Sequence, residues 1–128
     1  MNRAVLFSAI AATALLATTL ASAQDVENGA EVFKRCRACH DVGDKAKNKV
    51  GPLLNGIIGR RAGTIEGFKY SDANLKAGTD GWEWTEEKMM EYLLNPRAAM
   101  PGNKMAFAGL KDEQDRKDLI AYLKTFPK

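Results

Sequence analysis

The chain carries both of its cysteines and its only histidine in one run of five residues, Cys36-Arg37-Ala38-Cys39-His40. Two thiols separated by two residues and followed directly by an imidazole form the pattern that covalent attachment of a c-type haem requires. Each thiol can bond to one vinyl group of the same porphyrin, and the imidazole can bind the iron as its proximal ligand. The motif therefore predicts one haem, anchored by Cys36 and Cys39, with His40 on the iron.

Two other uses of closely spaced cysteines fit the sequence less well. A thioredoxin-like pair lies between a strand and a helix, whereas the segment from Asp41 to Val50 contains glycine and several lysines. A structural zinc site takes four cysteine or histidine ligands, and the chain has three such residues. A thiol–disulfide enzyme would also show titratable thiols and no haem staining after denaturing electrophoresis, so that the alternatives can be distinguished.

The N-terminus has the pattern of a secretory signal peptide. Met1-Asn2-Arg3 gives a positive start, Ala4 to Leu20 is uncharged and mostly apolar, and Ala21-Ser22-Ala23 is a small-x-small cleavage site. The run is rich in weakly hydrophobic alanine and threonine, which makes a retained membrane anchor the weaker alternative. We expect cleavage after Ala23 and export to the periplasm.

The mature chain is expected to form a single domain over residues 24–128. Cleavage removes only one charged residue, Arg3, and leaves 18 basic and 16 acidic residues, a formal net charge of +2. So slight a positive charge gives no support to nucleic-acid binding. A chain of this size buries a modest core, and a large apolar cofactor enclosed by the chain would add to that core.

Four segments of the mature chain show helical periodicity or helix caps. The expected helices cover residues of about 25–37, 72–76, 86–95 and 112–125. We expect Asp25, Thr85 and Asp112 to be the N-caps of the first, third and fourth of these helices. A turn is expected over residues 78–81, between the second and third of these helices. Because glycine allows close approach of another helix, we expect the first and last helices to cross at Gly29 and Phe33.

The segment from Pro96 to Gly109 is expected to be a loop without regular structure. It contains two prolines, two glycines and two methionines, and loops of this length are usually functional. A methionine thioether is a soft ligand that suits haem iron. Met105 follows the turn at Pro101-Gly102 and lies in an apolar run, so we prefer it as the sixth ligand, with Met100 as the alternative.

Polar groups elsewhere in the chain suit the rest of a haem site. The carbonyl of Pro52 lies in a segment rich in glycine and is a candidate acceptor for the second N–H of the His40 ring. Arg60, Tyr70 and a tryptophan are donors of the kind that hold carboxylates in partly buried sites. They are therefore candidates for binding the two haem propionates.

These motifs together resemble those of the class I cytochromes c, and most closely the soluble bacterial members that are similar to the mitochondrial carrier. The resemblance covers essentially the whole mature chain, with the motifs in the family's order. The matching motifs are Cys36-x-x-Cys39-His40, Gly51-Pro52-Leu53-Leu54-Asn55-Gly56, Tyr70-Ser71-Asp72-Ala73-Asn74, Trp84 to Tyr92, Asn95-Pro96, Pro101-Gly102-Asn103-Lys104-Met105-Ala106-Phe107-Ala108-Gly109 and Asp118-Leu119-Ile120-Ala121-Tyr122-Leu123.

The resemblance implies an all-α fold in which the N- and C-terminal helices cross and short helices and loops wrap around one covalently bound haem. It implies that His40 and Met105 are the axial ligands, that the carbonyl of Pro52 accepts from His40, and that a propionate is bound by three donors. These donors would be Arg60, Tyr70 and Trp84. Trp84 is preferred to Trp82 because its distance to Tyr92 and Asn95-Pro96 matches the family. Asn74 and Tyr92 would belong to the polar network near the Met105 sulfur, and Phe107 would shield the ring face.

The implied function is soluble one-electron transfer in the periplasm between membrane respiratory or photosynthetic complexes, without enzymatic activity. A quinol-oxidising complex would be the donor, and an oxidase or a reaction centre the acceptor, each docking through an acidic face on a monomeric carrier. The basic residues expected around the exposed haem edge are Arg35, Lys47, Lys49, Arg97, Lys104 and Lys111. The alternative from another class is a gas-binding or peroxidatic haem protein with a labile sixth ligand, which would bind carbon monoxide readily.

Overall fold

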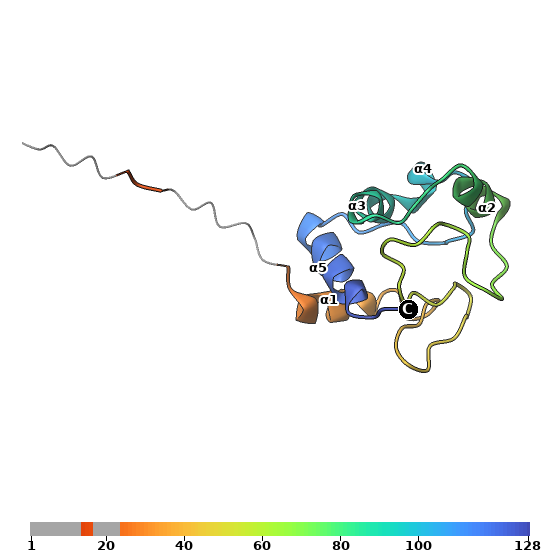
Figure 1. Cartoon of the computed structure of the whole chain (residues 1–128), viewed down its shortest axis with the longest axis horizontal. Helices are drawn as coiled ribbons and strands as arrows, with labels where there is room; N and C mark the ends of the chain where they lie inside the picture. The colour runs from red at the N-terminus through yellow and green to blue at the C-terminus, as the bar shows by residue number, and fades with distance from the viewer. Residues whose placement is uncertain (1–13, 17–23) are drawn as a thin grey trace, which may run out of the picture.

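The structure is a computed structural model that describes residues 14–16 and 24–128 (Figure 1). The expected signal peptide and its cleavage site lie outside the described residues, apart from residues 14–16. The described helices are α1 (Val26–Phe33), α2 (Asp72–Thr79), α3 (Glu86–Leu94), α4 (Pro96–Ala99) and α5 (Glu113–Lys124). The predicted all-α class is confirmed, and within the described ranges β pairing is limited to one isolated bridge between Arg61 and Glu83. No helix in these ranges combines the length and apolar character needed to cross a membrane.

The first helix, α1, begins at its predicted cap but ends earlier than predicted. A carboxylate oxygen of Asp25 accepts a hydrogen bond from the Asn28 N–H at 3.0 Å. The helix ends at Phe33, and the chain then tightens, with the Cys36 N–H donating to the Phe33 carbonyl at 2.8 Å. The prediction that the helix continues to Arg37 was wrong by about one turn, because the cysteine pair lies on these tighter turns.

The second helix, α2, is longer than predicted. It continues to Thr79, beyond the predicted residues 72–76. Of the predicted turn over residues 78–81, only residues 80 and 81 form a turn, because residues 78 and 79 belong to the helix. Gly78 lies inside the helix, where a Cβ would be 2.1 Å from the carbonyl oxygen of Ala62. The glycine therefore permits the close approach of two segments and does not end the helix.

The segment over residues 96–109 is not wholly irregular, because α4 occupies its first four residues. A side-chain oxygen of Asn95 accepts a hydrogen bond from the Ala98 N–H at 3.2 Å. Pro96 takes the first helical position, where the missing N–H costs no hydrogen bond. The prediction of a structureless loop was thus wrong for these four residues, since the proline that stops α3 also starts α4.

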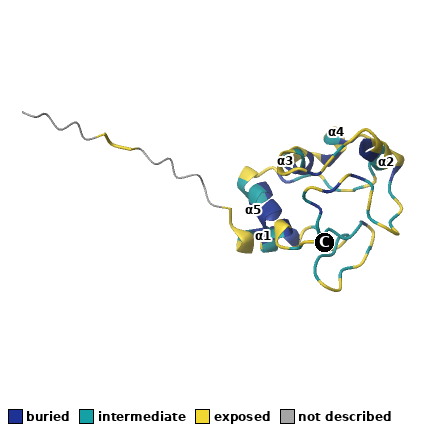
Figure 2. Ribbon diagram, viewed as in Figure 1, coloured by how far each residue is buried: buried dark blue, intermediate teal, exposed yellow. Residues whose placement is uncertain are grey.

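The helices α1 and α5 cross as predicted. Figure 1 shows them packed side by side, and Figure 2 shows buried residues on α5 where they meet. At the crossing, a Cβ on Gly29 would be only 2.1 Å from the backbone oxygen of Asp118. The ring centroids of Phe33 and Tyr122 are 5.5 Å apart beside this point. The helices α1 and α5 are therefore joined at a point where a side chain larger than that of glycine would clash.

A buried carboxylate, that of Asp118, lies at the same crossing. It accepts hydrogen bonds from the Asp25 N–H, the Asn28 side-chain amide and the Gln114 side-chain amide, each at 2.8 Å. Burial raises the pKa of Asp118, but the three donors outweigh burial and hold the pKa below its ordinary value. The charged form of Asp118 therefore stabilises the docking of α1 on α5.

Replacement of Asp118 by Asn is expected to lower the free energy of unfolding by about 2 kcal/mol at neutral pH, because the new amide N–H groups face three donors. Since the folded pKa of Asp118 is depressed, its contribution is complete above the unfolded value of about 4 and is lost as the pH falls below it. Urea unfolding between pH 7 and pH 3 should therefore show a smaller loss of stability on acidification in Asp118→Asn than in the unmodified protein. The same pH dependence in both proteins would contradict this role.

Candidate haem-binding site

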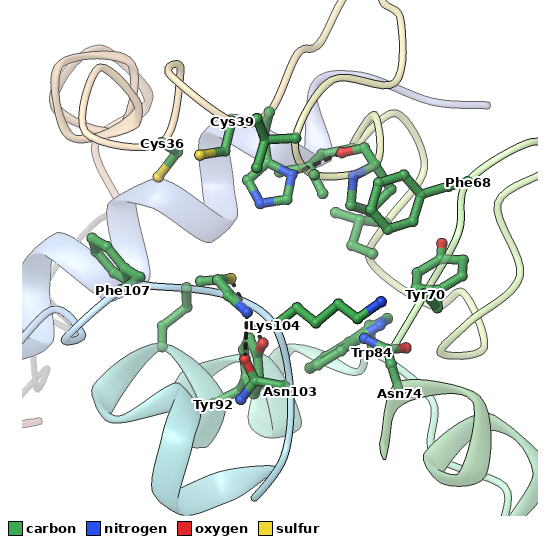
Figure 3. A pocket seen from close by; sticks show the side chains of 18 of the residues that line it. Cys36, Cys39, Phe68, Tyr70, Asn74, Trp84, Tyr92, Asn103, Lys104 and Phe107 are labelled. Atoms are coloured by element: carbon green, nitrogen blue, oxygen red, sulfur yellow. Dashed lines mark hydrogen bonds between the residues drawn. The ribbon is translucent and has the colours of Figure 1, made fainter. Parts of the chain in front are cut away.

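The structure contains a cavity of about 470 Å³ enclosed by side chains from most of the chain. It is bounded by residues of α1, α2, α3 and α5 and of the segments between them. Figure 3 shows Cys36 and Cys39 on one wall, Tyr92 and Asn103 on the opposite wall, and Tyr70, Asn74 and Trp84 at one side. The predicted site residues that line it are Cys36, Cys39, His40, Pro52, Arg60, Tyr70, Asn74, Trp84, Tyr92, Met105 and Phe107. The structure thus brings all eleven of them into one cavity.

The two cysteines lie on consecutive tight turns after α1. The N–H groups of Cys39 and His40 both donate to the Cys36 carbonyl, at 3.1 and 2.9 Å, and neither sulfur forms a disulfide. Burial raises the pKa of the Cys36 thiol to about 11, against the opposing effect of the nearby Arg35 charge. Thiol–disulfide exchange requires a thiolate, so this thiol is poorly suited to a redox enzyme that acts at neutral pH.

The imidazole of His40 is held by a single backbone oxygen. Its Nδ1 lies 2.7 Å from the carbonyl oxygen of Pro52, and because a carbonyl can only accept, Nδ1 carries the proton. The predicted hydrogen bond is therefore present, and Nε2 keeps its lone pair. A Cβ on Gly51 would be 2.4 Å from the ring, so a glycine is needed beside it.

The protonation state of His40 suits metal binding. Burial lowers the pKa of the ring, the bond to Pro52 acts in the opposite direction, and the charge of Lys49 lowers the pKa further. The net effect is a neutral imidazole, which is the form that ligates a metal. Together with the fixed Nδ1 proton, this leaves Nε2 as the ring atom available to bind a metal.

The two loop methionines occupy different environments. Met105 lines the cavity, and its sulfur accepts a hydrogen bond from the Tyr92 hydroxyl at 3.6 Å. Burial raises the pKa of Tyr92 to about 12, so the hydroxyl remains a donor. Met100 caps the end of α4, is buried away from this cavity and borders a separate surface hollow. Of the two candidates for sixth ligand, only Met105 is placed to serve.

Of the candidate propionate donors, Tyr70 and Trp84 lie on one side of the cavity (Figure 3), and Arg60 also lines it. The guanidinium of Arg60 is buried and donates to the carbonyls of Asn55 at 3.0 Å and Leu53 at 3.4 Å, which leaves other N–H groups available. The Tyr70 oxygen accepts from the Ile65 N–H at 3.0 Å and keeps its own proton to donate. These groups are therefore oriented by the chain and still able to bind an acid.

The two neighbouring tryptophans pack edge-on, with ring centroids 5.4 Å apart, but they border different hollows of the structure. Trp84 is buried and lines the cavity, whereas Trp82 borders the surface hollow. The Lys88 ammonium lies 4.5 Å from the centroid of the Trp82 ring. The structure therefore places Trp84, and not Trp82, with the other polar groups of the cavity.

The residues of the cavity fit a haem. A neutral imidazole and a thioether supply the nitrogen and sulfur donors that low-spin haem iron takes, and two thiols lie beside the imidazole. Asn74 lines the same cavity, and its side-chain oxygen is buried without a hydrogen-bond partner among the described residues. A buried acceptor without a partner is costly, which indicates that a further polar group belongs beside Asn74.

Some lining residues were not predicted from the sequence. Phe68, Met89 and Asn103 contribute to the cavity, although none of them was a predicted site residue. Phe68 packs edge-on against Tyr70, with ring centroids 4.8 Å apart. For Asn103 the available signal was its position two residues before the candidate ligand Met105.

Known proteins share both the sequence and the shape of this chain. The family model for cytochrome c matches residues 26–127. Cytochrome c2 of Blastochloris viridis is 58% identical over 106 residues, which cover 83% of this chain and 81% of the relative. Cytochrome c-550 of Ancylobacter novellus is 59% identical over 98 residues, covering 77% of this chain and 92% of the relative. The solved structure of cytochrome c2 from Rhodospirillum centenum superposes with a TM-score of 0.76 at 47% identity, covering 81% and 99% of the two chains.

Proposed function

The chain belongs to the cytochrome c family and carries single electrons with a covalently bound haem c, and we propose that Cys36 and Cys39 anchor this haem while His40 and Met105 ligate its iron. The observation that carries the proposal is the convergence of all four side chains on one cavity. His40 offers Nε2 because Pro52 holds its other nitrogen. Met105 offers its sulfur, which accepts a hydrogen bond from the Tyr92 hydroxyl.

When bound, the haem iron supplies ferric and ferrous states that differ by one electron. His40 and Met105 would both hold the iron, which would leave no vacant site for a small molecule to bind. Arg60, Tyr70 and Trp84 offer donors to the two propionates in a partly buried setting. Phe107 lies beside the cavity in Figure 3 and would shield the ring from water. These roles favour an electron carrier over a gas-binding or peroxidatic protein.

The absorption spectra of the oxidised and reduced protein test this function. We expect the absorption spectrum of a covalently attached haem, with the weak far-red band of ferric iron bound by a thioether. In a redox titration we expect each chain to take up one electron. We also expect no ready binding of carbon monoxide by the ferrous protein at neutral pH. A protein without the far-red band that binds carbon monoxide rapidly would belong to the gas-binding class instead.

The N-terminal pattern supports export. Under this proposal the leader over residues 1–23 is cleaved after Ala23, and residues 24–128 act in the periplasm as one domain. The carrier would accept electrons from a quinol-oxidising membrane complex and deliver them to an oxidase or a reaction centre. It would act as a monomer that docks on acidic faces of these partners.

A set of unpaired basic side chains supports docking of this kind. The lysines that form salt bridges are elsewhere: Lys34, Lys76, Lys88, Lys117 and Lys124. The six predicted rim residues are all exposed, and none of them forms a salt bridge with a carboxylate in the described part of the chain. Two of the six, Arg35 and Lys104, line the cavity itself. Unpaired charge beside the cavity would steer the protein toward acidic partners.

Removal of one rim charge should slow docking more than removal of a paired charge. We expect Arg35→Gln and Lys104→Gln each to reduce the association rate with a quinol-oxidising complex by a factor of about 2 to 5 at low salt, with a flatter salt dependence. The control Lys124→Gln removes the same charge from a pair with Glu86. Stopped-flow measurements at several salt concentrations compare them. Equal slowing in all three variants would show that net charge, and not this face, controls docking.

A further inference from the structure

Every polar group of the Asn103 side chain is bonded to the backbone around Met105. Its amide nitrogen donates to the carbonyls of Pro96 at 2.9 Å and Met100 at 2.8 Å. Its oxygen accepts from the Met105 N–H at 2.8 Å. Because the nitrogen faces two acceptors and the oxygen faces a donor, the orientation of the amide is fixed. Asn103 thus joins both ends of α4 to the backbone of the candidate ligand.

The segment that carries Met105 has few other backbone contacts. The Asn103 N–H donates to the Met100 carbonyl at 3.2 Å, and the Phe107 N–H donates to the Met105 carbonyl at 3.0 Å. The Met105 N–H itself donates to the side-chain oxygen of Asn103. Figure 3 shows Asn103 beside Tyr92, on the wall opposite Cys36 and Cys39. The position of the thioether therefore depends on this side chain.

We propose that Asn103 is a positioning residue for Met105: its three hydrogen bonds hold the thioether toward the iron and oppose its displacement by an external ligand. The inference rests on the proposed ligation by Met105. Tyr92 contacts the sulfur, whereas Asn103 holds the backbone that delivers it. Without Asn103, α4 and the ligand segment would move independently, and states with the sulfur withdrawn would become more populated.

The test compares Asn103→Ala and Asn103→Leu with the unmodified haem-loaded protein. The first removes the side chain, and the second keeps a similar volume but removes all three hydrogen bonds. We expect both variants to raise the affinity of the ferric protein for free imidazole by about tenfold, since each lost hydrogen bond contributes modestly to the closed state. The far-red band should also be lost at a lower imidazole concentration than in the unmodified protein.

The matched control is Asn55→Ala. The Asn55 side chain also bridges an irregular segment, accepting from the Gly43 N–H at 3.0 Å and donating to the Gly43 carbonyl at 2.9 Å, but it does not line the cavity. We expect this variant to lose stability to urea while keeping the imidazole affinity and the far-red band of the unmodified protein.

Two results would overturn the inference. Unchanged imidazole affinity in both Asn103 variants would show that these hydrogen bonds do not hold Met105 in place. A change in Asn103→Ala alone would show that the packing of the Asn103 side chain, and not its hydrogen bonding, holds Met105. A far-red band missing from the unmodified protein would instead refute ligation by Met105, so that failure of the proposed function is recognised separately.

Discussion

The ferrous Met105→Ala variant is expected to bind carbon monoxide rapidly, whereas the unmodified protein should not bind it readily at neutral pH. The substitution removes the thioether that lines the cavity and leaves one axial position without a ligand from the chain. Met100 cannot replace it, because that side chain is buried at the end of α4, outside the cavity. The far-red band of the ferric protein should disappear in the same variant. Flash photolysis and absorption spectroscopy measure both effects.

Two conservative variants serve as controls for this prediction. Met100→Leu and Met89→Leu keep the side-chain volume and remove a sulfur, so each should keep the far-red band and exclude carbon monoxide. Met89 is the informative control, because its buried side chain borders the same cavity. If Met89→Leu bound carbon monoxide and Met105→Ala kept the band, α3 and not the loop would supply the ligand.

The second large effect is expected at the crossing of the terminal helices, where Gly29→Ala should lower the free energy of unfolding by about 2 kcal/mol. Alanine favours a helix over glycine by about 1 kcal/mol, so α1 alone would become more stable. However, the added Cβ would lie 2.1 Å from the Asp118 backbone oxygen and 2.7 Å from the Tyr122 Cβ. Because the nearest atom belongs to the backbone, α1 and α5 must move apart, and such overpacking typically costs 1–3 kcal/mol, here at about the upper end.

Urea unfolding of the haem-loaded protein measures this change, with Glu31→Ala as the control on the same helix. Glu31 is exposed, and within residues 14–16 and 24–128 it forms a salt bridge with Lys34 alone, so its loss should change the stability by about 0.5 kcal/mol or less. A Gly29→Ala protein as stable as the unmodified one would show that the crossing tolerates a side chain. The sign of the measured change therefore decides between helix propensity and close packing.

The starts of the helices were predictable from the sequence, and their ends were less so. Asp25, Thr85 and Asp112 cap α1, α3 and α5 as predicted, because a cap is a bond between residues three apart in the chain. The end of α1 depends on the turns that carry the cysteines, and the length of α2 depends on packing against Ala62. The hydrophobic periodicity of the sequence therefore predicts neither the end of α1 nor the length of α2.

In the candidate site, too, the features set by neighbouring residues were predictable from the sequence, and those set by the path of the chain were less so. The Cys36–His40 motif indicates its own chemistry, since the thiols and the imidazole are adjacent in the chain. The choice between Met105 and Met100 is different, because both lie in one loop and only the path of α4 separates them. Asn103 was missed because its side chain bonds to two backbone carbonyls and one backbone N–H, groups that any sequence would supply.

The mass of the exported polypeptide, produced together with a haem-attachment machinery and measured after denaturation, tests the covalent haem most directly. The expected result is the mass of residues 24–128 plus one haem, and the mass of the polypeptide alone for a variant with Cys36→Ser and Cys39→Ser. An exported, unmodified chain that carries no added haem mass under these conditions would contradict the assignment of both cysteines, of the axial ligands and of electron transfer.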